Sequence, residues 1–330
     1  MKMEQMKLTF VNVGYGEAIL LEIPEASRRD GIFTALIDGG SADRQEYEDR
    51  SSGRIPVWDY LQKEHIGHLD LMVCTHIHED HVSGMRKAAQ ILPPGELWQT
   101  LPVSFYENMR DLDPAAAQNL SQDKFLRALN DYRELCVQTV EHGGFIRKVD
   151  CGQTMSLGGD GYLEALAPSE REQSELEEAM AELFAESETG RFLQKLSELD
   201  RRMNNYSLIL RIVYQDRCVL LPGDTNARGY AGIPQEKLQA DLFKIGHHGQ
   251  KDGISGELLK IISPEAVVCC ASSDRRYDSA HPDVVRMLED MGIRPYFSDC
   301  PPTANGEIPP HRALRFIVGR EHPMTGEYIS

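Results

Sequence analysis

The chain places three imidazoles and one carboxylate within six consecutive positions: His76, His78, Asp80 and His81. They directly follow the apolar run 69–74, which predicts a buried strand ending at a loop. In extended backbone His76 and His78 point to the same side. Imidazole and carboxylate together suit zinc, manganese or iron, and structural sites more often contain thiolates. The motif therefore predicts an open, catalytic metal centre; an exposed histidine-rich loop is the alternative.

Further ligand-type residues follow three later apolar runs: Asp224, the pair His247-His248, and His281. If the four strand ends converge at one edge, they supply about six ligands for two divalent ions. Asp224 has no cation beside it in the sequence, so it is the best candidate to bridge the ions, with a helix N-cap as the alternative. Adjacent residues of a strand point in opposite directions, so one histidine of the pair is a ligand, and the sequence does not say which.

Residues near these positions are candidates for supporting roles. Asp38 ends the apolar run 32–37 and either supports the metal ligands from behind or forms a turn. Lys244 and Lys251 flank the histidine pair and could hold phosphate oxygens; the alternative is that both are surface lysines. His281 could donate a proton to a leaving group, or it is a turn or cap residue before a proline.

Composition narrows the class of protein. The 330 residues are 41% hydrophobic and 26% charged, as expected for a globular chain, and we interpret them as a single domain, 1–330. The net charge of −17 repels nucleic acid, so a polyanion would need a local basic or metallic patch. Seven cysteines without a C-x-x-C pair indicate reduced thiols. With no export signal and no long apolar stretch, we expect a cytoplasmic protein without a membrane partner.

The chain alternates between predicted strands and helices. Apolar runs predict strands at 8–13, 18–23, 32–37, 69–74, 207–213, 218–221, 241–245, 266–270, 294–298 and 313–318. Helices are predicted at 55–65, 85–91 and 283–291, the second of them starting after His81. Glycines in 143–161 indicate a small antiparallel sheet, and Asn305-Gly306 indicates a turn.

Two helical segments, 104–140 and 168–202, are predicted insertions. In the second, Leu176, Met180 and Leu183 recur at helical spacing within a sequence rich in glutamate. This pattern predicts one or two amphipathic helices with a solvated face. A lid or a dimer contact is the alternative, and a protein partner could bind there.

Six segments in order resemble the ComEC-type branch of the metallo-β-lactamase fold: 11–18, 36–40, 76–81, 205–210, 221–224 and 243–249. The likeness extends to His281-Pro282 and to the Asn305-Gly306 turn. It implies a four-layer αββα sandwich, in which two mixed sheets face each other, helices lie outside, and two divalent ions, zinc or manganese, bind in a groove at one edge.

The resemblance also implies a division of the ligands. His76 and His78 would bind one ion, and Asp80, His81 and one histidine of the 247–248 pair the other, with Asp224 between them. Many relatives carry a further metal histidine where this chain reads Asn204-Asn205-Tyr206-Ser207. The ion at His76 and His78 is therefore expected to bind weakly, or to be completed by water or substrate.

Another departure lies in the first turn, where Tyr15 and Glu17 replace the glutamine and aspartate that the ComEC pattern favours. This difference leaves the support around Asp38 uncertain. Asn205 and Ser207, beside the missing histidine, are predicted to contact the substrate.

These observations predict a metal-dependent hydrolase, and the resemblance implies a phosphodiesterase, either a nuclease or an enzyme acting on nucleotide-like phosphodiesters. A metal-bound hydroxide would attack phosphorus, with Asp80 and His281 as catalytic residues. The same centre could instead hydrolyse a lactone, thioester or β-lactam. A metal-binding regulatory module with little turnover is the third hypothesis. The expected partner is a phosphodiester, and nucleic acid and nucleotides are the candidate classes.

Overall fold

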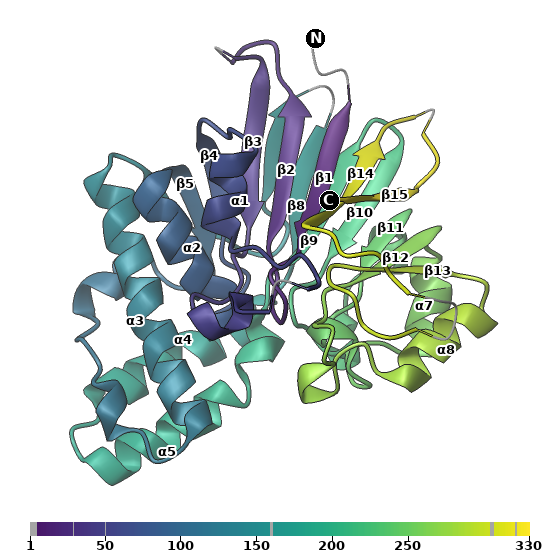
Figure 1. Cartoon of the computed structure of the whole chain (residues 1–330). Helices are drawn as coiled ribbons and strands as arrows, with labels where there is room; N and C mark the ends of the chain where they lie inside the picture. The colour runs from purple at the N-terminus through teal and green to yellow at the C-terminus, as the bar shows by residue number, and fades with distance from the viewer. Residues whose placement is uncertain (1–4, 29, 50, 159–160, 304–306, 321) are drawn as a thin grey trace.

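The computed structural model describes residues 5–28, 30–49, 51–158, 161–303, 307–320 and 322–330. In these residues two mixed sheets pack face to face with helices on both outer faces (Figure 1). The fold is therefore the predicted four-layer αββα sandwich. The predicted Asn305-Gly306 turn lies outside the described residues.

The first sheet has the strand order β15-β14-β1-β2-β3-β4-β5-β6. Its strands β14, β1, β2 and β3 pair antiparallel, and those from β3 to β6 pair parallel. The described bounds are β1 (Met6–Val11), β2 (Ile19–Pro24), β3 (Ile32–Ile37), β4 (Leu69–Val73), β5 (Pro94–Gln99), β6 (Phe145–Lys148), β14 (Ala313–Val318) and β15 (Gly326–Ile329).

The second sheet has the strand order β13-β12-β11-β10-β9-β8-β7 and is parallel from β10 to β13. The described bounds are β7 (Thr154–Gly158), β8 (Gly161–Ala167), β9 (Ile209–Tyr214), β10 (Arg217–Leu221), β11 (Leu242–Lys244), β12 (Ala266–Cys269) and β13 (Arg294–Phe297). Strands β7 and β8 pair antiparallel, as predicted for 143–161. They belong to the second sheet and β6 to the first, so this region does not form a small sheet of its own.

The described helices cover the outer faces of the two sheets. Those beside the first sheet are α1 (Val57–Lys63), α2 (Glu79–Ile91), α3 (Leu120–Glu141), α4 (Glu170–Ala185) and α5 (Thr189–Asp200). Those beside the second are α6 (Gln235–Leu238), α7 (Gly256–Ile262) and α8 (Pro282–Asp290). No described helix has both the length and the apolar character that a membrane crossing requires.

Strand β4 illustrates why the apolar runs were informative. Leu71 and Val73 point into the core between the sheets, whereas Met72 points toward the helices. A parallel strand buried on both faces reads as a continuous apolar run, and its end delivers the next residues to the sheet edge. Buried parallel strands thus carry the histidine motif to this edge.

The two segments predicted to be insertions form a helical block that consists mainly of α3, α4 and α5, at the lower left of Figure 1. The side chains of Leu176, Met180 and Leu183 are buried, and α5 packs against α3. Ser169 and Glu172 form a capping box at the start of α4. The amphipathic pattern was therefore correct, and the inserted helices bury their apolar faces within the molecule.

Candidate metal centre

Loops at the ends of β4, β10 and β11 bring four ligand-type side chains together. Ligand atoms of Asp80, His81, Asp224 and His248 all lie within 4.8 Å of one another. Asp80 and His81 occupy the first turn of α2, which begins at Glu79 rather than at residue 85 as predicted. The apolar helical period starts only later, but acids in a first turn favour a helix start.

Close backbone packing fixes this turn of α2 against the loop after β3. The amide of Gly39 donates to the carbonyl of His81, and that of Gly84 to Gly40, each at 2.8 Å. A Cβ atom at Gly84 would lie 1.8 Å from the carbonyl oxygen of Gly39. The helix can approach this loop only with glycine at that position, and this approach sets the place of His81.

The imidazoles of His81 and His248 are each held through one nitrogen, which leaves the other facing the centre. Nδ1 of His81 lies 2.8 Å from Asp38 Oδ2, and Nδ1 of His248 lies 2.7 Å from the carbonyl oxygen of Cys270. The Nε2 atoms of both rings are buried without a hydrogen-bond partner. They lie 3.3 Å and 2.9 Å from Asp224 Oδ2. Unpartnered imidazole nitrogens beside carboxylates fit a divalent cation.

The electrostatics of the four residues also favour a cation. Burial disfavours the charged imidazole of His248, but Asp224 and Asp80 outweigh it and raise its pKa to about 9. Burial likewise opposes protonation of His81, yet the surrounding carboxylates raise its pKa well above the ordinary value. Burial also works against ionisation of Asp224, but the histidines and Lys244 hold its pKa well below the usual range. Without a metal, protons on the histidines must compensate the carboxylates.

The other pair of histidines lies beside this cluster. His76 Nε2 and His78 Nδ1 are 3.1 Å apart, and the ring centroids of His76 and His81 are 4.2 Å apart. The other nitrogen of His76 lies 3.1 Å from Thr75 Oγ1. Burial, reinforced by the neighbouring histidines, lowers the pKa of His76 well below its ordinary value, so this ring is neutral, as a metal ligand must be.

Asp38 contacts the outer nitrogen of His81, which fits one of its two predicted roles, support of the metal ligands. Its carboxylate accepts hydrogen bonds from the amide and the hydroxyl of Thr75 at 2.9 and 2.7 Å, in addition to facing His81. Its backbone is left-handed, with φ 53°. The sequence could not distinguish this role from a turn, because the partners lie 37 and 43 residues away.

The adjacent histidines separate as expected. Both have a left-handed backbone, with φ 47° for His247 and 52° for His248. This bend turns His248 into the cluster, whereas His247 lies at the pocket wall with Nδ1 2.8 Å from Asp252. His248 is therefore the candidate ligand of the pair.

Lys244 does not fit the predicted contact with phosphate. Its side chain is fully buried, its ammonium is paired with Glu17, and it donates to the carbonyl of Gly223 at 2.7 Å. The same ammonium lies 3.3 Å from Asp224 Oδ1. Lys244 thus pairs with Asp224, the candidate to bridge the two ions. Glu17, which appeared in the sequence only as a departure from a pattern, balances its charge.

Four other predicted residues lie outside the lining of the pocket. Lys251 is exposed and pairs with Asp283, while Asn205 bonds to Asn226. Ser207 is buried, and its hydroxyl accepts from the amide of Asp224 at 3.3 Å. His281 caps α8, with Nδ1 accepting from an amide at 3.1 Å. The structure therefore does not support the predicted substrate contacts or the predicted general acid; for His281 the cap alternative holds.

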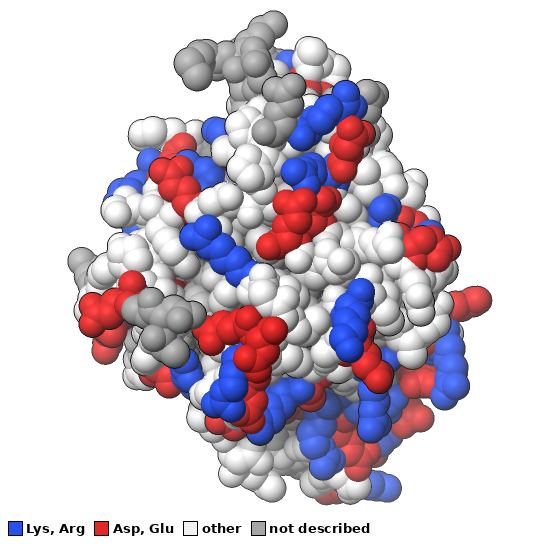
Figure 2. Space-filling view, turned by 90° about the vertical axis from the view of Figure 1, so that its right-hand side faces the viewer, with Lys and Arg blue, Asp and Glu red and all other residues white. Residues whose placement is uncertain are grey.

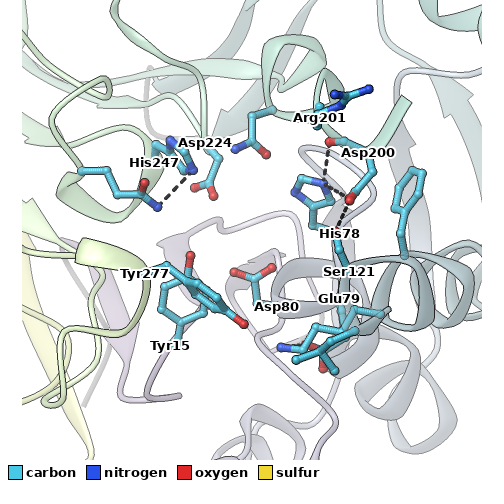
Figure 3. Close-up of a pocket in the computed structure, with 15 residues that line it drawn as sticks. Tyr15, His78, Glu79, Asp80, Ser121, Asp200, Arg201, Asp224, His247 and Tyr277 are labelled. Carbon is cyan, nitrogen blue, oxygen red and sulfur yellow. Dashed lines mark hydrogen bonds and ion pairs between the residues drawn. The ribbon is translucent and has the colours of Figure 1, made fainter. Parts of the chain in front are cut away.

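A pocket of about 580 Å³ opens above the ligand cluster, and Figure 3 shows its walls. Much of it is built from residues that the sequence did not indicate, including segments outside the resemblance. These residues are Tyr15 and Tyr277 on one side and Ser121, Asp200 and Arg201 on the other, and Lys124 and Phe125 also line the pocket.

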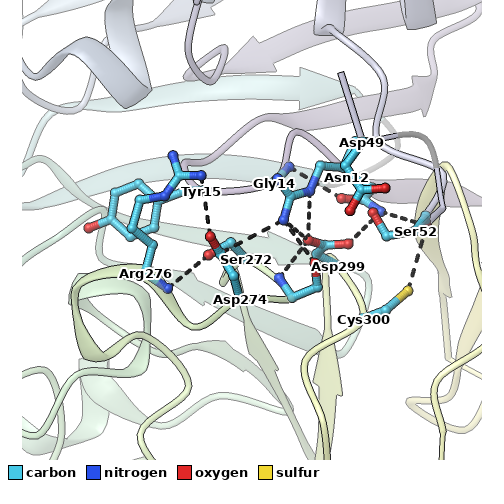
Figure 4. A network of polar contacts seen from close by, with 12 residues as sticks. Asn12, Gly14, Tyr15, Asp49, Ser52, Ser272, Asp274, Arg276, Asp299 and Cys300 are labelled. Atoms are coloured by element: carbon cyan, nitrogen blue, oxygen red, sulfur yellow. Dashed lines mark hydrogen bonds and ion pairs between the residues drawn. The ribbon is translucent and has the colours of Figure 1, made fainter. Parts of the chain in front are cut away.

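A polar network behind the two tyrosines joins the first loop to the C-terminal quarter of the chain (Figure 4). Arg54 is nearly buried and lies 2.9 Å from both Glu46 and Asp299. Glu46 also accepts from the amide of Tyr15 at 3.0 Å and pairs with Arg276. One buried carboxylate thereby anchors segments that carry both tyrosines.

The four-layer fold and its histidine–carboxylate cluster are similar to those of metallo-β-lactamase-fold proteins. Among curated proteins, ComE operon protein 3 of Bacillus subtilis (strain 168) is similar to this chain: it is 21% identical over 294 residues, which cover 87% of this chain and 31% of the relative. The chain thus spans about a third of that relative's length. It matches no protein-family model.

Similar solved structures include a metal-dependent hydrolase from Parabacteroides distasonis ATCC 8503, with 14% identity, a TM-score of 0.42, and coverage of 88% of this chain and 92% of that one. Another is a metal-dependent hydrolase of the β-lactamase superfamily, with 12% identity, a TM-score of 0.45, and coverage of 88% and 95%. A diphosphatase from the PhnP family has 12% identity, a TM-score of 0.38, and coverage of 80% and 85%.

Proposed function

We propose that the protein is a metal-dependent hydrolase that cleaves nucleotide-like phosphodiesters. The observation that carries this proposal is the convergence of unpartnered imidazole nitrogens with Asp80 and Asp224 beneath one pocket. His81, His248 and Asp80 would hold one ion, and the remaining two histidines the other, with Asp224 between them. Two bound ions, zinc or manganese, would supply an activated water and neutralise the charge that develops on phosphorus.

The pocket wall offers cations for a phosphate group. Lys124 and Arg201 both line it: the Lys124 ammonium lies 3.7 Å from Glu79 and 5.8 Å from the centroid of the Tyr277 ring, and Arg201 Nε donates to the carbonyl of Ser197 at 3.1 Å. A phosphodiester keeps its negative charge throughout the reaction, so two cations beside the centre suit it better than a neutral ester or lactam. We therefore propose Lys124 and Arg201 for the phosphate-binding role that was predicted for Lys244 and Lys251.

His247 is the better candidate to protonate a leaving oxygen. It lines the pocket but lies outside the ligand cluster, and Asp252 faces its Nδ1. Asp252 behind Nδ1 fixes the ring, and Nε2, which lies 3.2 Å from the side-chain amide nitrogen of Gln250, is the nitrogen that would exchange a proton. We therefore transfer the proposed general-acid role from His281 to His247.

The two tyrosines favour a substrate with a planar group. Tyr277 is 51% exposed, and its ring centroid lies 5.0 Å from that of Tyr15 and 5.8 Å from the Lys124 ammonium; the Tyr15 ring in turn lies 4.6 Å from that of His248. Four nearby non-glycine residues have positive φ: Arg275, Tyr277, Asp278 and Ala280. Such strain clusters at functional sites, and an exposed ring face is a stacking surface for a nucleobase.

The surface charges favour a small substrate over a long duplex. On the face shown in Figure 2, lysine and arginine side chains lie directly beside aspartate and glutamate side chains. Affinity for duplex nucleic acid depends on a track of unpaired cations along the backbone. With a net charge of −17 in addition, we expect a nucleotide or a short strand as substrate.

A substrate panel tests the proposal. Purified protein loaded with Mn²⁺ or Zn²⁺ should cleave bis(p-nitrophenyl) phosphate and at least one of cyclic nucleotide, dinucleotide, RNA or DNA, and Asp80→Ala should abolish the activity. Hydrolysis of p-nitrophenyl esters, lactones or nitrocefin without phosphodiester cleavage would instead assign acyl chemistry. Two ions per chain with no turnover on either panel would favour the regulatory module.

A further inference from the structure

The inserted helices reach the half of the centre that lacks a third histidine. Asp200, the last residue of α5, directs Oδ1 to within 3.2 Å of His78 Nε2, and its backbone carbonyl oxygen lies 3.3 Å from the same nitrogen. Figure 3 shows this contact on the pocket wall opposite the tyrosines. This segment therefore brings a carboxylate to a predicted metal ligand.

The geometry determines which nitrogen of His78 is available. Two acceptors on Asp200 face Nε2, so this nitrogen carries the proton and Nδ1 keeps its lone pair. Nδ1 is also the atom that lies 3.1 Å from His76 Nε2. The same arrangement holds at His81, where Asp38 occupies the outer nitrogen and leaves the inner one free. A carboxylate behind a metal-binding imidazole fixes the tautomer and orientation of the ring.

Helix stability does not explain an acid at this position. Asp200 lies at the C-terminus of α5, where a negative charge faces the negative end of the helix dipole, and no basic residue lies in the last turn of this helix. Its second oxygen accepts a hydrogen bond from the hydroxyl of Ser121 on α3. The carboxylate is thus held between an inserted helix and the histidine motif, at an electrostatic cost to its own helix.

We infer that Asp200 is a positioning residue for the metal site of His76 and His78, and that docking of the α4–α5 hairpin sets how tightly this ion binds. Asp200 acts through His78: it holds the ring so that Nδ1 and the Nε2 atom of His76 face one point. The inference rests on the metal centre of the proposed function. It gives the inserted hairpin a task that neither its amphipathic pattern nor the comparisons assign.

A double-mutant cycle on metal binding tests the inference. Metal-free wild type, Asp200→Ala, His78→Ala and the double variant are titrated with Zn²⁺ against a chromophoric chelator, and two dissociation constants are fitted. We expect Asp200→Ala to weaken one ion by about 10- to 100-fold and to leave the other unchanged. In the His78→Ala background the second substitution should have no further effect, because the two residues act as one unit.

Two controls separate positioning from a general effect on the fold. Glu182→Gln removes an exposed carboxylate of the same hairpin, paired with Lys195 at 3.2 Å, and should change neither dissociation constant. Thermal unfolding should show that Asp200→Ala is at least as stable as wild type, since it removes an acid from a helix C-terminus. A structural role would instead lower the melting temperature together with affinity for both ions.

The outcomes are distinct. The inference is overturned if Asp200→Ala leaves both constants unchanged, or if it weakens binding equally in the presence and absence of the His78 side chain, as a direct ligand would. Wild-type protein that binds no ion would overturn both this inference and the proposed function. If the protein binds two ions and the mutant cycle gives the expected result but no substrate of the panel is hydrolysed, the inference about Asp200 stands and the proposed hydrolase function is rejected.

Discussion

The two halves of the metal centre present the same ligand chemistry on different supports. His81 and His248 are fully buried, and residues directly after β3 and β12 hold their outer nitrogens. His78 is 20% exposed, and its support comes from an inserted helix. Sheet ends are rigid, whereas a docked hairpin can move, so the first half is expected to bind its ion tightly and the second to be adjustable.

The largest expected effect comes from replacing Lys244, the buried lysine beside the ligands of the tighter ion. Lys244→Met should lower the free energy of unfolding by about 3–5 kcal/mol, because it leaves Glu17 and Asp224 buried without their cation. Urea denaturation of the metal-free protein measures it. Lys251→Met, an exposed lysine of the same sequence region, is the matched control and should leave the midpoint unchanged. Equal midpoints for both variants would show that the buried pair does not support this half.

The pH dependence of binding should distinguish the halves next. Metal must displace protons from His248, whose raised pKa is about 9, and from His81, whose pKa is raised well above the ordinary value, so affinity for the tighter ion should rise with pH from 7 to at least 9. The gain approaches roughly tenfold per pH unit when one proton is released. His76, with its lowered pKa, has no proton to lose in this range. Two constants with identical pH slopes would contradict the distinction.

Replacing Asp38, which holds the His81 ring, should weaken the ion whose binding Asp200→Ala is expected to leave unchanged. Asp38→Ala should weaken the tighter ion by about 10- to 100-fold, because the His81 ring loses the acceptor that fixes it. The chelator titration with Asp200→Ala alongside gives the comparison. If both substitutions weaken the same ion, the centre does not divide as described.

The smallest effect is expected at the pocket wall, away from both halves. Tyr277→Ala should raise the KM for a nucleotide substrate about fivefold, equivalent to about 1 kcal/mol of stacking and at the lower end of the usual range, since Tyr277 is half exposed. Tyr277→Phe keeps the ring and should behave as wild type. Neither substitution should change metal binding. An unchanged KM for Tyr277→Ala would exclude the stacking role.

Much of the fold could be predicted because buried parallel strands appear as apolar runs that end in polar residues. The runs before His76, Asp224 and His248 are of this kind, and they placed the ligands at one edge. Strand β5 was missed because Pro94, Gly95 and Glu96 interrupt its pattern. The start of α2 was predicted too late because its first turn contains ligands in place of an apolar stripe.

The site's details depended on contacts between distant residues. Asp200 and His78 are 122 positions apart, and only the docking of α5 brings them together. Lys244 and Lys251 are similar in the sequence, yet one closes a buried strand and the other lies in an exposed turn. His248 is the candidate ligand of the pair because both histidines have a left-handed backbone. The sequence of the two residues gives no sign of this conformation.

The pairing of β1 with β14 has a consequence for the order in which the protein can assemble. Met6 lies opposite Val318, so β1 is joined by a strand that is synthesised long after it. The histidine motif is synthesised long before Asp224, His248 and this closing strand. Until β14 has been synthesised, one edge of β1 has no partner, and unpaired edges invite association between chains. The metal ligands thus emerge well ahead of the fold that assembles them.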